Sequence, residues 1–302
     1  MSEFRLTTVE EFEAATARLL ETGAKVGADS WQARVKNQTP HCKFGEEGIC
    51  CRICTMGPCR ITKKAPRGIC GCDVHGIVGR NYLKFTAGGA ATHSDHGREI
   101  CHTLYEASAD GCYKVKDPEK LIRIAKEWGM ETEGKDIYEL AHEVALEGLM
   151  EYGKPFGTQR FLKRAPESQQ KLWEENELAP HAIDREVSRS LHMAHMGCSS
   201  KPEALVKQSI RAGLSDGWGG SMMGTEFSDI LFGTPKPIET EANLGVMVEE
   251  NVNIVVHGHD PSLSEMICEV ADSPEMIAYA KEQGAKGITI SGVCCTSTEV
   301  AM

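Results

Sequence analysis

Cysteines are concentrated in one short part of this 302-residue chain, and their spacing suits a metal cluster. Seven of the thirteen cysteines form the cysteine segment, residues 42–72: Cys42, Cys50, Cys51, Cys54, Cys59, Cys70 and Cys72. The series Cys51-x2-Cys54-x4-Cys59-x10-Cys70 provides the four thiolates that one 4Fe–4S cluster requires. A four-cysteine zinc site is the alternative, but zinc sites usually contain two short Cys-x2-4-Cys pairs, and here only Cys51 and Cys54 form one. The spacing favours an iron–sulfur cluster and leaves Cys72 open as a competing fourth ligand.

Two cysteines of this segment, Cys42 and Cys50, remain outside that ligand set. Cys50 directly precedes Cys51, and adjacent residues rarely direct both side chains at the same small cluster. Two thiolates are half of what a 4Fe–4S cluster needs, and a two-fold symmetric dimer would bring the pair together with its copy. The sequence therefore predicts a homodimer with a shared cluster; a pair of ordinary buried thiols is the alternative.

Three histidines follow a glycine-containing stretch at residues 87–90, in a composition that suits a helix. On a helix, His93 and His96 lie about 60° apart and His102 lies about a further 120° round the axis. This spiral cannot form one metal-facing edge. Because imidazoles titrate near neutral pH, such a strip could pass protons between a buried site and water. Ordinary surface or core histidines are the alternative.

A β–α–β pattern ends the chain. A short apolar run at Val252–Val256 and a second at Ile288–Ile290 flank helical residues around 262–283. Such strands should be parallel, with their carboxyl ends on the same edge, where open α/β sheets bind ligands. His259 and Cys295 each fall just beyond a strand end, so both could reach one metal. An isolated histidine and a buried cysteine are the alternative. The sequence contains no G-x-G-x-x-G phosphate-binding loop, so we do not expect a dinucleotide at this edge.

The order of the predicted helices and strands indicates a mixed fold in two domains. The sequence predicts a mainly α-helical domain over residues 1–236, and this domain contains the cysteine segment. Two prolines at residues 233–240 mark the boundary. Residues 237–302 then predict the start of a Rossmann-like α/β domain with parallel strands. Because a lone β–α–β unit leaves a bare sheet edge, we expect this domain to be truncated.

Composition narrows the class of protein. The net charge of −11 and the absence of a basic stripe argue against nucleic acid as a partner. The acidic N-terminus lacks the apolar region of a signal peptide, and no apolar run is long enough to span a bilayer. We therefore expect a cytoplasmic protein, in which clustered cysteines are metal ligands rather than disulfides.

Several motifs together resemble one enzyme family. The runs are CKFGEEGICCRICTMGPCRI, GICG, GGAATHSDHGR, GTEFSDILFGTPKPIETEANLGV, VVHGHDPSLSEMI and GVCCTSTEV. They are similar to the N-terminal half of anaerobic nickel–iron–sulfur carbon monoxide dehydrogenases, a family that includes a subunit of acetyl-CoA synthase complexes. By this resemblance, Cys51, Cys54, Cys59 and Cys70 hold the B cluster and Cys72 is not a ligand. Cys42 and Cys50 hold half of the D cluster at the dimer axis.

The same resemblance assigns the remaining candidates. His93, His96 and His102 serve proton transfer, with His93 nearest the active metal and Glu99 at a position that is often another histidine in the family. His259 and Cys295 bind the pendant iron of the nickel-bearing C cluster. The other ligands of that cluster come after residue 302 in the family, so we expect a fragment of a longer enzyme that is inactive alone.

The resemblance implies the reaction CO + H2O → CO2 + 2 H+ + 2 electrons, with electrons passed through 4Fe–4S clusters to a ferredoxin-like acceptor. An acetyl-CoA synthase subunit is a further expected partner. Two alternatives remain open: a hybrid-cluster protein that resembles hydroxylamine reductase, and a non-catalytic iron–sulfur electron-transfer or sensor fragment.

Overall fold

The computed structural model describes residues 9–110, 114–196, 198–234, 247–258 and 261–295. Two compact units are present: Cys42–Thr234, and a second that combines Met1–His41 with Pro235–Met302. The first unit is built mainly from helices. The domain division expected from the sequence, 1–236 and 237–302, stays a prediction.

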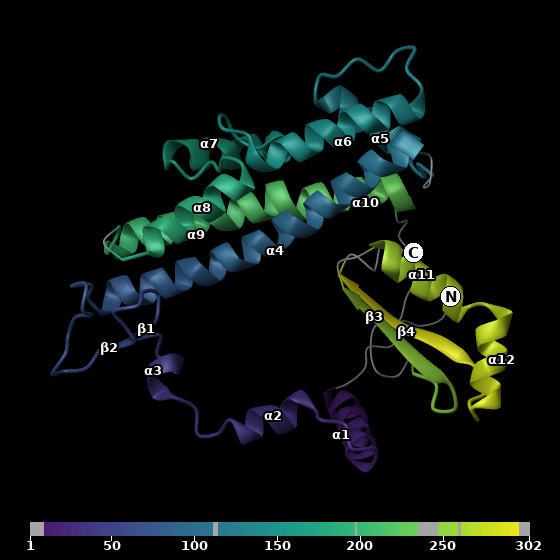
Figure 1. The fold of residues 1–302 in the computed structure, drawn as a ribbon, viewed down its shortest axis with the longest axis horizontal. Helices are drawn as coiled ribbons and strands as arrows, with labels where there is room; N and C mark the ends of the chain where they lie inside the picture. Colours follow the sequence, from purple (N-terminus) through teal and green to yellow (C-terminus); the bar gives the residue numbers. More distant parts are fainter. Residues whose placement is uncertain (1–8, 111–113, 197, 235–246, 259–260, 296–302) are drawn as a thin grey trace. The chain divides into compact units, whose positions relative to one another are not determined.

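One long helix, α4 (Val74–Asp110), organises the first unit (Figure 1). It packs against α6 (Ile137–Gly153), α8 (Ile183–Ala194) and α9 (Pro202–Ser215). The sequence predicts this helix only after Gly88 and Gly89, but the structure begins it at Val74. Each glycine costs about 1 kcal/mol in a helix, and buried residues on both sides, among them Leu83 and Ala90, offset that cost through packing.

The core of this unit lies between α4, α6 and the shorter helices around them. The remaining elements are α3 (Lys43–Glu46), α5 (Pro118–Glu127), η1 (Arg160–Arg164), α7 (Glu167–Glu175), the π-helix η2 (Asp216–Ser221) and α10 (Met222–Phe232). Leu104, Val144 and Phe227 are fully buried together in this core. A Cβ on Gly148 would lie 2.6 Å from the Phe227 ring. Only glycine therefore lets that ring lie directly against α6.

The cysteine segment begins with α3 and continues through two short strands, β1 (Cys50–Cys51) and β2 (Cys59–Arg60), which pair antiparallel. Asn81 on α4 ties it to the helical unit. Its side-chain amide donates to the carbonyl oxygens of Gly48 (3.0 Å) and Cys50 (2.9 Å). These bonds give two backbone carbonyl oxygens of the segment a donor on α4, so the segment is held against α4.

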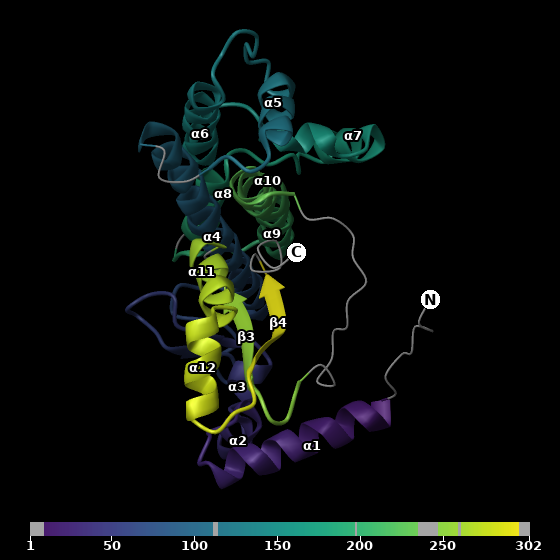
Figure 2. The same cartoon turned by 90° about the vertical axis from the view of Figure 1, so that its right-hand side faces the viewer.

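The second unit contains α1 (Val9–Lys25), α2 (Trp31–Asn37), β3 (Val252–Gly258), α11 (Pro261–Ala271), α12 (Pro274–Glu282) and β4 (Ile288–Cys295). Strands β3 and β4 pair in parallel, with α11 against both (Figures 1 and 2). The sequence predicts one helix between the strands; the structure has two, because Ser273 caps a new helix by accepting from the Met276 amide (3.3 Å). Among the described residues, no helix combines the length and apolar content of a membrane span.

Candidate functional site

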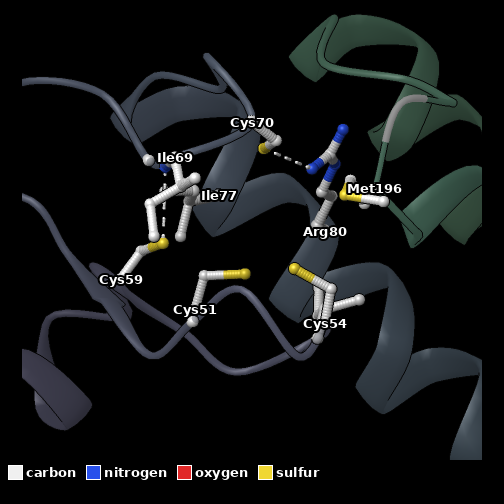
Figure 3. Close-up of a pocket in the computed structure, with 11 residues that line it drawn as sticks. Cys51, Cys54, Cys59, Ile69, Cys70, Ile77, Arg80 and Met196 are labelled. Atoms are coloured by element: carbon white, nitrogen blue, oxygen red, sulfur yellow. Dashed lines mark hydrogen bonds between the residues drawn. The ribbon is translucent and has the colours of Figure 1, made fainter.

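Four of the predicted cluster ligands line one pocket: Cys51, Cys54, Cys59 and Cys70 (Figure 3). Cys51 and Cys59 lie opposite each other on the paired strands β1 and β2. Cys54 lies in the turn between these strands, and Cys70 lies in the loop that leads to α4. All four are free thiols. Local pairing and a returning loop thus gather cysteines that are spread over twenty residues of sequence.

Close backbone contacts and N–H donors shape this pocket. A Cβ on Gly57 would lie 3.1 Å from the Cys51 carbonyl oxygen, so the turn between the strands needs glycine there. The Ile69 amide donates to Cys59 Sγ (3.5 Å), and Arg80 Nη1 donates to Cys70 Sγ (3.7 Å). Such donors favour thiolates, the form in which cysteine binds metals.

Hydrogen bonds from Cys72 and Arg80 affect the pKa of Cys70. A hydrogen bond from the backbone of Cys72 lowers the pKa of Cys70, burial opposes it, and the hydrogen bond and charge of Arg80 lower the pKa further. The pKa of Cys70 is therefore lower than that of an ordinary cysteine.

Cys72 has a different environment and does not line the pocket. Its side chain is only 2% exposed, and a Cβ on Gly76 would lie 2.4 Å from Cys72 Sγ. Its thiol donates to the Asp73 carbonyl oxygen (3.6 Å), and burial raises the pKa of Cys72. The spacing argument left Cys70 and Cys72 as competitors, and the two now differ in burial and in direction of pKa shift.

The remaining pair, Cys42 and Cys50, does not line this pocket. Cys42 is exposed at the start of α3 and Cys50 is half-buried in β1. Across the described ranges, no three His, Cys, Asp or Glu side chains converge closely enough to hold a single metal ion. The four pocket cysteines line a common pocket without converging on one ion position.

The histidine strip lies on α4, as the helical spacing predicts. His93 Nδ1 is 2.6 Å from Asp216 Oδ1 on the π-helix η2, and the His93 side chain is one-third exposed. Next to it, His96 is half-buried, and a Cβ on Gly224 would lie 3.5 Å from its ring. His102 is exposed. The strip thus leads from a carboxylate-bonded histidine to the surface.

Sequence reasoning missed three residues around these sites: Arg80, Met196 and Asp216. Arg80 and Met196 line the cysteine pocket, and Asp216 bonds His93. The glycines that follow Asp216 are the one signal that points to it, because they permit close approach. A Cβ on Gly220 would lie 2.9 Å from His93 Cβ. π-Helical turns such as η2 are rare and occur frequently at functional sites.

The predicted pair at the sheet edge is only partly described. His259 lies outside the described residues, directly after the last residue of β3. Cys295 is the last residue of β4, where its backbone pairs with Gly258. The structure therefore places Gly258 and Cys295 at the ends of neighbouring parallel strands, and the predicted role of His259 stays a prediction.

Comparison with known proteins identifies the family. The Prismane/CO dehydrogenase family matches residues 49–302. The chain is 44% identical to carbon monoxide dehydrogenase 1 of Methanosarcina acetivorans, over 99% of this chain and 49% of that protein. It is 42% identical to the carbon monoxide dehydrogenase/acetyl-CoA synthase subunit beta of Moorella thermoacetica, over 88% of this chain and 40% of that protein.

Solved structures agree with these matches. The fold is similar to that of an as-isolated, nickel-free carbon monoxide dehydrogenase from Thermococcus sp. AM4, with a TM-score of 0.86 and 46% identity over 95% of this chain and 46% of that one. The chain spans about half the length of the curated relatives that it matches. On these grounds the chain belongs to the Prismane/CO dehydrogenase family.

Proposed function

We propose that this chain is part of an anaerobic carbon monoxide dehydrogenase, which oxidises CO with water to CO2, two protons and two electrons. The observation that carries the proposal is the pocket lined by Cys51, Cys54, Cys59 and Cys70, found in a chain of this family. Four free thiols around one space, two of them accepting N–H donors, fit the ligand set of a 4Fe–4S cluster.

These four cysteines would hold the cluster within one subunit, and when bound it supplies one-electron transfer. The chain's own contribution is to present four sulfurs and to direct donors at two of them. Cys72 is packed against Gly76 and thus stays out of the ligand set. His259 and Cys295 would contribute to the nickel–iron–sulfur cluster, Cys295 from the end of β4, which pairs in parallel with β3. These strands would begin a Rossmann-like domain.

The histidine strip would move protons away from the reacting water. The Asp216 carboxylate, 2.6 Å from His93 Nδ1, favours the tautomer that carries a proton on Nδ1, in which Nε2 is the acceptor nitrogen of the ring. His96 and His102 follow on the same helix, and His102 reaches solvent. His93 and His96 are half-buried and His102 is exposed, which supports transfer towards solvent at His102.

The partners follow from the same proposal. Cys42 and Cys50 would share a second cluster with their copies in a homodimer, and a ferredoxin-like protein would accept the electrons. An acetyl-CoA synthase subunit is a further partner, since one relative carries that name. Such an enzyme would act in the cytoplasm.

The test is CO-dependent viologen reduction by anaerobically prepared, metal-replete full-length protein, with iron and nickel measured per chain. We expect turnover together with both metals. Iron without nickel, together with hydroxylamine reduction, would point to a hybrid-cluster protein instead. Iron without any turnover would point to an electron-transfer or sensor role. Within the proposal, His93→Gln should lower turnover with metal content unchanged; loss of metal in that variant would contradict the proton role.

A further inference from the structure

Arg80 is a buried cation beside the cysteine pocket. Its side chain is 3% exposed, and Nη1 donates to Cys70 Sγ at 3.7 Å (Figure 3). In the part of the chain that the structure describes, Arg80 forms no ion pair with a carboxylate; its acceptors are that sulfur and a backbone carbonyl. Buried cations normally require a negatively charged partner. Of the two acceptors of Arg80, Cys70 Sγ is the one that becomes negatively charged when cysteine binds a metal.

The guanidinium is held in a fixed position. Its Nε donates to the Ser199 carbonyl oxygen at 2.6 Å. One helical turn before Arg80, a Cβ on Gly76 would lie 2.8 Å from the Ser200 carbonyl oxygen. The chain at residues 199–200 therefore lies directly against α4, and the acceptor for Arg80 has little room to move. A planar guanidinium bound at both Nε and Nη1 retains its orientation better than a flexible surface side chain.

A fixed positive charge at a ligand sulfur has a redox consequence. The potential of an iron–sulfur cluster depends on net charge, on hydrogen bonds to the sulfurs and on solvent exposure. Reduction by one electron makes the cluster more negative, so a nearby cation stabilises the reduced form more than the oxidised form. Because Arg80 itself is buried, its charge is screened less than that of a surface side chain.

We propose that Arg80 is a positioning residue that raises the reduction potential of the cluster held by Cys51, Cys54, Cys59 and Cys70, through its charge and its hydrogen bond to Cys70. The inference rests on the proposed function, because it requires that cluster. It assigns Arg80 a role in electron transfer that does not involve binding iron.

The experiment is a redox titration of the anaerobic, iron-replete full-length protein, followed by electron paramagnetic resonance, with dithionite supplying the electron. The signal of this cluster is identified by its loss in Cys54→Ser. For Arg80→Gln we expect the ratio of reduced to oxidised cluster, at the wild-type midpoint potential, to fall about tenfold, which corresponds to about 59 mV for one electron. Arg52→Gln removes the same charge from an exposed neighbour of Cys51 and should leave the midpoint unchanged.

The possible results distinguish a failure of the proposed function from a failure of the role of Arg80. A wild-type protein that binds no cluster at this pocket would refute the proposed function and the role of Arg80 with it. A full iron content with an unchanged midpoint in Arg80→Gln would overturn the role of Arg80 alone. If Arg80→Gln loses iron, the midpoint potential and iron content of Arg80→Lys are measured instead, since that variant retains the positive charge. Retained iron with a midpoint near that of the wild type supports the proposal, and iron loss in Arg80→Lys as well overturns it.

Discussion

Replacing Glu186 by glutamine is expected to destabilise the helical unit by about 3 kcal/mol. Glu186 lies on α8 and is fully buried. Its carboxylate accepts hydrogen bonds from Arg211 Nη2 (2.6 Å), Gln208 Nε2 (2.8 Å) and the His181 backbone amide (2.9 Å). These contacts join α8 to α9 and to the chain that precedes α8. Glutamine fits the same space but leaves the buried Arg211 cation without its carboxylate.

The magnitude follows from the ionisation of this carboxyl. Burial alone would raise the pKa of Glu186, but hydrogen bonds from Arg211, His181 and Gln208 outweigh burial and lower the pKa from 4.5 to about 2. A difference of that size corresponds to about 3 kcal/mol. The range of about 3–5 kcal/mol for breaking one partner of a buried ion pair agrees with it. Because the folded-state pKa is the lower one, the stabilisation is complete above pH 4.5 and is lost as the pH falls towards 2.

Urea denaturation followed by circular dichroism, on the whole chain under anaerobic conditions, measures both effects. Between pH 7 and 4 the wild type should lose about 1 kcal/mol more of its unfolding free energy than Glu186→Gln. Glu177→Gln is the matched control, because Glu177 pairs with Lys207 (2.7 Å) at the exposed surface. That substitution should change stability little. Equal unfolding midpoints for Glu186→Gln and Glu177→Gln would refute the reasoning.

Three further predictions concern the candidate sites and the close helix contacts. Cys54→Ser should lose the iron of one 4Fe–4S cluster per chain, whereas Cys72→Ser should retain that iron. Equal iron loss in both variants, measured by metal analysis, would contradict the ligand assignment. Asp216→Asn should lower CO turnover by up to about 100-fold through the histidine that it holds, with unchanged nickel and iron, and loss of metal would argue against that role. Gly220→Ala should destabilise by about 1–3 kcal/mol because its Cβ would lie 2.9 Å from two side-chain carbons. Gly213→Ala, with open space around it, should not destabilise, and similar urea midpoints for the two alanine variants would show that the α4–η2 contact relaxes.

Local patterns predicted which cysteines gather at one pocket and that the three histidines share a helix. The ligand spacing from Cys51 to Cys70 is short, so the chain itself keeps those thiols near one another. Helical periodicity likewise placed His93, His96 and His102 on a spiral, and all three lie on α4. The beginning of α4 at Val74 was not predictable in the same way, because packing outweighs the weak helix preference of its glycines.

The sequence alone determined the family resemblance and the set of candidate cysteine ligands, since these depend on residue types at short spacing. The tertiary structure decided which of two neighbouring cysteines lines the pocket, because burial against Gly76 separates Cys72 from Cys70. It also supplied the partners from distant positions: Ser199 lies 119 residues from Arg80, and Asp216 lies 123 residues from His93. No local pattern encodes such contacts, because they exist only once α8, α9 and η2 have packed against α4.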